Sequence, residues 1–110
     1  MTKATIYRSK DGLIRGFKIR GHAGANRQGE YDLVCAAISA IGYTAVGALV
    51  ELCGIKDYSE SDGSLGMMLP DDVSPDVSAK AEIILEALEI GLRQVERQYS
   101  RHLCVLNEEV

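Results

Sequence analysis

Residues 21–35 read Gly-His-Ala-Gly-Ala-Asn-Arg-Gln-Gly-Glu-Tyr-Asp-Leu-Val-Cys, and they join short alternating segments to a long apolar run. Asp32 is a suitable N-cap for a helix that begins at Leu33, because its carboxylate can accept hydrogen bonds from the first turn. Cys35 then lies at about the third helical position, near the positive end of the helix. An imidazole such as that of His22, together with a helix N-terminus, favours the nucleophilic thiolate. This stretch therefore predicts an activated cysteine.

The periodicity of apolar residues on both sides of this stretch predicts an α+β fold with the element order ββαββαβ. Alternation with a period of two indicates strands, and a repeat near 3.6 residues indicates helices. The predicted elements are, in chain order, strands at 2–9 and 13–19, a helix at 33–52, strands at 55–59 and 64–69, a helix at 75–99 and a strand at 101–106. A chain of 110 residues has the size of one domain. We therefore expect a single compact domain, 1–110, in which both helices pack on one face of the sheet.

Composition and charge exclude several classes of function. The net charge is −4 and the 12 basic residues are dispersed, so no direct nucleic-acid partner is predicted. Cys35, Cys53 and Cys104 show no Cys-x-x-Cys spacing, and no histidine pair has the spacing of metal ligands. We therefore expect no metal and no cofactor. An odd number of cysteines and no segment that resembles a signal peptide favour reduced thiols in the cytoplasm.

The run from residue 33 to residue 50 is long enough to be considered for a membrane span. It contains 18 residues without a charge. It also contains Gly42, Gly47 and five alanines, so few of its positions are strongly hydrophobic, and acidic residues flank it at Asp32 and Glu51. These features favour a buried helix of a soluble protein, with no membrane association.

Two parts of the chain resemble a known family. The segment Gly21-His22-Ala23-Gly24, followed by Gly29 and by Asp32-Leu33-Val34-Cys35-Ala36-Ala37-Ile38-Ser39-Ala40, closely resembles the signature of the ribosomal-processing cysteine protease family, often called Prp. The second helix adds weaker matches at Ile84, Leu85, Leu88, Gly91, Leu92, Val95 and Tyr99. The resemblance implies a homodimeric cysteine endopeptidase that removes the short N-terminal extension of the bacterial large-subunit ribosomal protein twenty-seven.

The chemistry of a cysteine protease assigns roles to His22 and Cys35, which the resemblance implies as a dyad. Cys35 would attack the peptide carbonyl, and His22 would accept the thiol proton and later protonate the leaving amine. Backbone N–H groups at the helix start would hold the oxyanion. Taken without the motif, Cys35 would be a small core residue and His22 an exposed loop side chain. His102, Cys53 and Cys104 are expected to be structural.

Other residues of the motif are candidates for supporting roles. Asp32 is predicted to be a helix cap, with orientation of the imidazole as the less favoured alternative. Ser39 lies one turn beyond Cys35, where it either lines the substrate pocket or packs against a neighbour. Gly21 and Gly24 are candidates for residues that line the substrate pocket or belong to the loop beside it.

Two alternative functions remain open from the sequence. One is a non-catalytic, ribosome-associated binding module in which the cysteine is only packed. The other is a thiol hydrolase for small acyl substrates. In the favoured interpretation, the loop of residues 22–31 is a gate that closes over an extended peptide, because its small and polar residues offer little apolar surface to hold it shut.

Overall fold

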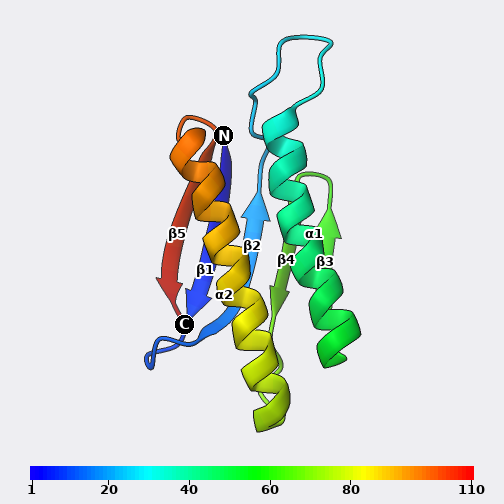
Figure 1. The fold of residues 1–110 in the computed structure, drawn as a ribbon, viewed down its shortest axis with the longest axis vertical. Helices are drawn as coiled ribbons and strands as arrows, with labels where there is room; N and C mark the ends of the chain where they lie inside the picture. The colour runs from blue at the N-terminus through cyan, green and yellow to red at the C-terminus, as the bar shows by residue number, and fades with distance from the viewer.

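The computed structural model describes residues 1–110, and its strands and helices follow the predicted order ββαββαβ. Both helices lie on one face of a five-stranded sheet (Figure 1), which confirms the predicted α+β class. The elements are β1 Thr2–Arg8, β2 Ile14–Arg20, α1 Leu33–Cys53, β3 Tyr58–Ser61, β4 Ser64–Met68, α2 Pro75–Gln98 and β5 Leu103–Glu109.

The sheet has the strand order β3-β4-β2-β1-β5 and is mixed. The two hairpins join through antiparallel pairing of β2 with β4, where Phe17 lies opposite Met67. The last strand, β5, runs parallel to β1 along the whole of β1. The N-terminus and the C-terminus consequently lie at opposite ends of the sheet (Figure 1).

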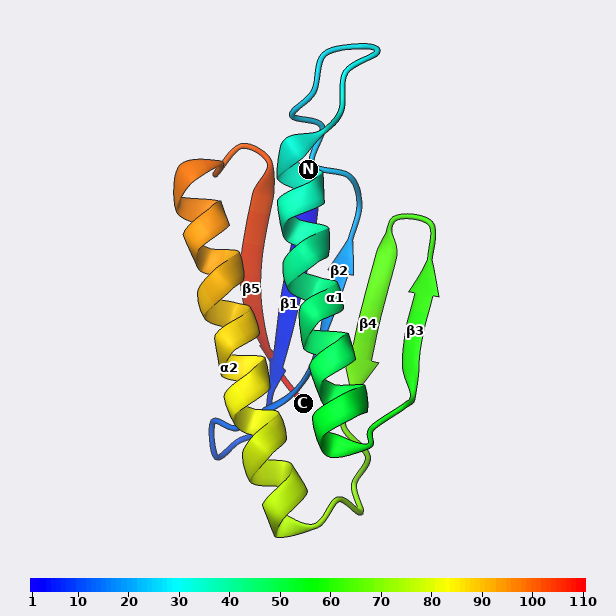
Figure 2. The ribbon, with the colours of Figure 1, turned by 45° about the vertical axis from the view of Figure 1, so that its right-hand side comes forward.

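Helix α1 covers the sheet over β2 and β4, while α2 lies toward β1 and β5 (Figure 2). The buried face of α1 consists of small and aliphatic side chains: Val34, Ile38, Gly42, Ala45, Val46 and Leu49. Gly42 permits this close approach, because a Cβ there would lie 3.0 Å from both Ile19 Cδ1 and Leu65 Cδ2. By length and composition alone α1 could cross a membrane, a test that core helices of soluble proteins also pass. In this fold one side of the helix packs on the sheet, as expected for a core helix.

The start of β3 differs from the prediction. The sequence indicated a strand from residue 55, but β3 begins at Tyr58. The reason is the end of α1: Gly54 adopts φ 68°, and the N–H of Ile55 donates to the carbonyl of Leu49 at 3.0 Å. Gly54 thus ends the helix in the left-handed αL conformation, and Ile55, which follows it, is buried against the helix end rather than used in a strand.

The position of β5 also differs from the prediction of residues 101–106. The N–H groups of His102 and Leu103 both donate to the carbonyl of Tyr99, which forms a turn after α2. The strand therefore begins at Leu103 and continues to Glu109. The bounds of the other elements agree with the prediction to within one residue.

A charged cluster joins α2 to β1 and β5. Glu89 is 8% exposed, and its carboxylate accepts hydrogen bonds from Arg8 at 2.5 Å, Arg93 at 3.0 Å and Asn107 at 3.0 Å. Burial alone would raise the pKa of Glu89, but the hydrogen bonds from Arg8, Asn107 and Arg93 outweigh it and lower the pKa. The cluster thus fixes the helix against strands that are distant in the sequence.

We expect Arg8→Met to destabilise the fold by about 2 kcal/mol at neutral pH, because it leaves the Glu89 carboxylate buried with fewer donors. A carboxylate with a lowered folded-state pKa stabilises the fold above its unfolded-state pKa and loses that contribution as the pH falls through the folded-state value. The difference between wild type and variant should therefore shrink in acid. Urea unfolding at neutral pH and in acid measures it. Arg97→Met, which removes a cation that forms no ion pair, is the control, and equal losses in the two variants would contradict the assignment.

Candidate active site

The loop that carries His22 leaves the sheet through a glycine that no other residue could replace easily. Gly21 adopts φ 95°, and a Cβ there would lie 2.8 Å from the carbonyl oxygen of Met1. Its N–H donates to the carbonyl of Gly63 in the β3–β4 turn at 2.8 Å. The turn is therefore fixed directly beside the point where His22 begins.

Asp32 caps α1, as the sequence predicted. Its Oδ1 accepts from the N–H of Cys35 at 2.9 Å, and its Oδ2 accepts from the N–H of Ala25 at 3.2 Å. These bonds, that of Cys35 first, lower the pKa of Asp32 and keep the carboxylate ionised. The carboxylate makes no hydrogen bond with His22, so its observed role is to hold the loop base against the helix.

Two backbone N–H groups beside the Cys35 thiol already have hydrogen-bond partners. The N–H of Cys35 bonds to the Asp32 side chain, and the N–H of Ala36 bonds to the Asp32 carbonyl at 3.0 Å. We expected backbone N–H groups at the helix start to hold the oxyanion, and these two groups are not free to do so.

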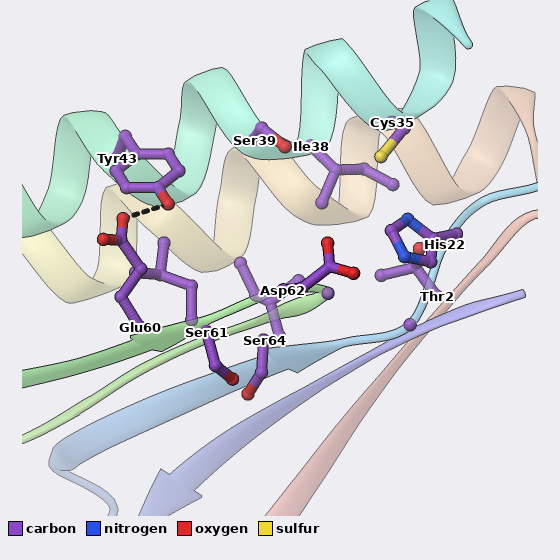
Figure 3. A pocket seen from close by; sticks show the side chains of 14 residues that line it. Thr2, His22, Cys35, Ile38, Ser39, Tyr43, Glu60, Ser61, Asp62 and Ser64 are labelled. Carbon is purple, nitrogen blue, oxygen red and sulfur yellow. Dashed lines mark hydrogen bonds between the residues drawn. The ribbon is translucent and has the colours of Figure 1, made fainter.

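His22 and Cys35 line one cavity of about 540 Å³ between α1 and the β3–β4 turn. Figure 3 shows the Cys35 sulfur pointing from α1 into the cavity, with the exposed imidazole of His22 below it. Gly21 and Ser39 also line this cavity, whereas Gly24 does not. The structure thus brings together four of the predicted site residues and leaves Gly24 in the loop, at φ 67°.

The cavity extends along α1 as a groove. Cys35, Ser39 and Tyr43 repeat every four residues on the side of the helix that faces the β3–β4 hairpin. A separation of eight helical residues corresponds to roughly 12 Å, the length of about four residues of an extended peptide. At the far end the Tyr43 hydroxyl donates to Glu60 of β3, which raises the pKa of Tyr43 (Figure 3). The shape therefore suits a short stretch of extended polypeptide.

Sequence reasoning missed site residues that come from other elements of the fold. Asp62 and Thr2 line the cavity, although they come from the β3–β4 turn and from the start of β1. His102 lies between β5 and the loop, and its Nδ1 is 3.0 Å from the carbonyl oxygen of Ala23. Because a carbonyl can only accept, this nitrogen carries the proton, and the bond fixes the residue that follows His22.

The imidazole of His22 packs over Gly63, and a Cβ at Gly63 would lie 3.1 Å from Nε2. Gly63→Ala should therefore displace the ring by a few tenths of an ångström and lower kcat/KM for a peptide substrate by up to about tenfold. Gly12→Ala is a matched control, because Gly12 also has a positive φ in a hairpin turn but has nothing within 4 Å of its Cβ position. Both variants should show similar losses of thermal stability from backbone strain. Equal kcat/KM values for the two would contradict the contact.

Neither of the other two cysteines belongs to this site. Cys53 ends α1 and Cys104 lies in β5, and all three thiols are free and half-buried. No group of three or more side chains is arranged to hold a metal ion. The chemistry available in the cavity is therefore that of a thiol, an imidazole and nearby hydroxyl and carboxylate groups.

Comparisons with known proteins point in one direction. A family model described as cysteine protease Prp matches residues 1–104. The ribosomal processing cysteine protease Prp of Bacillus subtilis is 35% identical over 108 residues, which cover 96% of each chain. The Prp protease of S. aureus, solved with a covalently linked product peptide, has a similar fold, with a TM-score of 0.81, 23% identity, and coverage of 98% of this chain and 100% of that one. The protein SMU.848 of Streptococcus mutans matches with a TM-score of 0.78 and 25% identity, over 100% of this chain and 96% of that one.

Proposed function

This chain belongs to the Prp family of cysteine proteases, and we propose that it removes the N-terminal extension of the bacterial large-subunit ribosomal protein twenty-seven. The observation that carries the proposal is the single cavity lined by both the Cys35 thiol, at the start of α1, and the imidazole of His22. The groove beside them has the length of a short extended peptide. Relatives named as ribosomal processing proteases support the choice of substrate.

The proposed reaction uses Cys35 as the nucleophile and His22 as the base and acid. Sγ attacks the scissile carbonyl while the imidazole takes the thiol proton, giving a tetrahedral oxyanion. The oxyanion collapses to a thioester, and the leaving amine takes its proton from the imidazolium. A water molecule, deprotonated by His22, then attacks the thioester, and the carboxyl product leaves as the thiol is restored.

The loop of residues 22–31 is proposed to close over the bound peptide. Apart from Ala23, its residues are exposed, and it projects beyond the end of β2 (Figure 2). Hydrogen bonds from His102 to Ala23 and from Ala25 to Asp32 hold only its base. Gly24, between these two anchors, is proposed to provide the bend, while Gly21 and Ser39 line the pocket.

The enzyme is proposed to act as a single domain in the cytoplasm, with no cofactor, no membrane and no direct contact with nucleic acid. Its substrate is a ribosomal protein, so a soluble enzyme near the site of protein synthesis is the simplest arrangement. The dispersed basic residues support a protein substrate rather than RNA.

A homodimer is also proposed, formed through the outer faces of the two helices. Between α1 and α2 lies an apolar groove of about 410 Å³, and no charged side chain lines it. Ile83 and Ile90 of α2 are 72% and 59% exposed, and the hydroxyl of Thr44 turns back to the carbonyl of Ala40. A second copy of the same surface would remove this apolar area from water.

Sedimentation of variants that carry a new charge on one surface tests whether the protein forms this dimer. Ala87→Glu places a charge in the helix groove and should shift the protein to monomer. Leu106→Glu, on the uncovered face of the sheet, adds the same charge and should leave the dimer intact. Dimers in both variants, or a monomeric wild type, would contradict the proposed interface.

Mass spectrometry of the extension peptide after incubation with the protein tests the proposed reaction. We expect cleavage at one bond, loss of cleavage in Cys35→Ala, and retention in Cys53→Ala and Cys104→Ala. A protein that binds the peptide without cleaving it would favour the binding module. Faster turnover of small thioesters than of the peptide would favour an acyl hydrolase.

A further inference from the structure

The imidazole of His22 has no hydrogen-bond partner to orient it. In thiol and serine hydrolases a third side chain commonly holds the catalytic histidine and fixes its tautomer. Asp32 does not serve this purpose, because its carboxylate is bonded to the N–H groups of Ala25 and Cys35. None of the side chains that line the cavity forms a hydrogen bond with the ring (Figure 3). The backbone on both sides of His22 is anchored, but the ring itself is not held.

A hydroxyl without a partner is buried beside this ring. Thr2 is 1% exposed, and its Oγ1 is the one buried side-chain oxygen or nitrogen that lacks a hydrogen-bond partner. Thr2 lines the same cavity as His22, and Figure 3 shows the two side chains next to each other. An unpaired buried hydroxyl costs free energy, so a position that keeps one requires an explanation.

The backbone of Thr2 is fixed against the loop that carries His22. A Cβ at Gly21, the residue before His22, would lie 3.7 Å from the Cα of Thr2. On its other side, the N–H of Thr2 donates to the carbonyl of His102 at 2.9 Å. The hydroxyl therefore occupies a defined place, whereas the exposed imidazole is free to change its rotamer.

We infer that Thr2 is a positioning residue whose hydroxyl orients the imidazole of His22. A protonated ring nitrogen donates to Oγ1, which leaves the other nitrogen to accept the proton of the Cys35 thiol. As an acceptor, the hydroxyl oxygen also stabilises the imidazolium that forms during the reaction. Because Thr2 is buried, it acts on the ring and not on the peptide. The inference rests on the proposed function, since it concerns how the same site is completed.

Two substitutions separate the hydroxyl of Thr2 from the shape of its side chain. Thr2→Val keeps the shape and removes the hydroxyl, so kcat for the extension peptide should fall about five- to tenfold while KM stays nearly the same. The same variant should unfold at a temperature about 2–5 °C higher, because a methyl group replaces an unpaired buried hydroxyl. Thr2→Ser keeps the hydroxyl and loses a buried methyl group, so it should unfold at a lower temperature and yet cleave within about twofold of wild type.

Alkylation of Cys35 by iodoacetamide gives a second measurement, which does not require the peptide. At neutral pH the thiol of Thr2→Val should react about threefold or more slowly than that of wild type, because a less stabilised imidazolium accepts the thiol proton less readily. In alkaline solution, where the thiol ionises without help, the two rates should converge. The carboxylates of Glu60 and Asp62 also line the cavity, and they are the same in every variant.

Thr5→Val is the matched control. Thr5 lies in the same strand, on the opposite face of the sheet and outside the cavity, so its substitution should leave the cleavage and alkylation rates unchanged. A wild-type kcat in Thr2→Val, or equal alkylation rates at neutral pH, would overturn the inference.

The remaining outcomes distinguish positioning from packing. If Thr2→Ser is as slow as Thr2→Val, the shape of the side chain matters rather than its hydroxyl, and the inference fails. A Thr2→Val protein less stable than wild type would also overturn it, because the hydroxyl would then have a structural partner. If wild type leaves the peptide intact, the proposed function fails, and the alkylation rates alone decide whether Thr2 positions His22.

Discussion

Cys35→Ala is expected to lower the rate of peptide cleavage by at least about 10⁴-fold, since the nucleophile itself is removed. The fold should change little, because Cys35 is half-buried and Asp32 bonds to its backbone N–H rather than to its side chain. A loss of about 1 kcal/mol in the free energy of unfolding is the expected size for removing one sulfur. Single-turnover assays measure the rate, and fluorescence anisotropy of a labelled peptide measures binding, which should persist.

The controls for this prediction are the two other cysteines. Cys53→Ala and Cys104→Ala each remove a half-buried thiol outside the cavity and should keep wild-type rates. Residual cleavage by Cys35→Ala within tenfold of wild type would refute a thiol mechanism, because the remaining groups in the cavity cannot form the thioester.

His22→Ala should lower the cleavage rate by about 10²- to 10⁴-fold, the usual contribution of a general acid–base. The same variant should slow alkylation of Cys35 at neutral pH, because the imidazole is the group that accepts the thiol proton. The Asp32 carboxylate offsets much of the positive end of α1, so the imidazole is expected to be the main source of activation. Brief treatment with iodoacetamide followed by mass spectrometry ranks the three thiols, and Cys35 should react first in the wild type.

The second histidine of the chain provides the comparison. His102→Asn keeps a nitrogen donor at the position of Nδ1 and should preserve the bond to the Ala23 carbonyl, with cleavage close to wild type. If iodoacetamide alkylates Cys35 as fast in His22→Ala as in wild type, the dyad is not formed. If Cys35 lags behind both other cysteines in the wild type, its thiol is not activated.

The fold could be predicted from the sequence wherever local pattern decides it. Buried Ala4 and Ile6 alternate with less buried residues in β1, and the apolar run of α1 begins at a clear cap, so these elements were predicted closely. The parallel pairing of β5 with β1 could not be predicted, because no local signal links segments at the two ends of the chain. The start of β3 was missed because Ile55, which resembles a strand residue, is buried against the end of the helix.

The site residues also divide into those that a local sequence motif predicts and those that depend on distant pairing. His22, Asp32 and Cys35 lie in one continuous motif, so a single stretch of sequence was enough to predict them. Asp62 lies in the turn between two predicted strands, and its place beside His22 depends on the pairing of β2 with β4. Thr2 did carry a usable signal: it occupies the same inward face of β1 as Ala4 and Ile6, where a polar side chain is unusual. Its hydroxyl is buried beside the cavity without a hydrogen-bond partner.

The β1–β5 pairing has a consequence for when the enzyme becomes active during its own synthesis. Segments about 100 residues apart must meet to form it, and contacts of such large separation form slowly in folding. The carbonyl of His102, just before β5, accepts the N–H of Thr2, and its imidazole holds Ala23, so the cavity depends on this late step. A nascent chain that still has β5 inside the ribosomal exit tunnel therefore lacks an assembled site. We expect proteolytic activity to appear only after β5 has emerged and paired with β1.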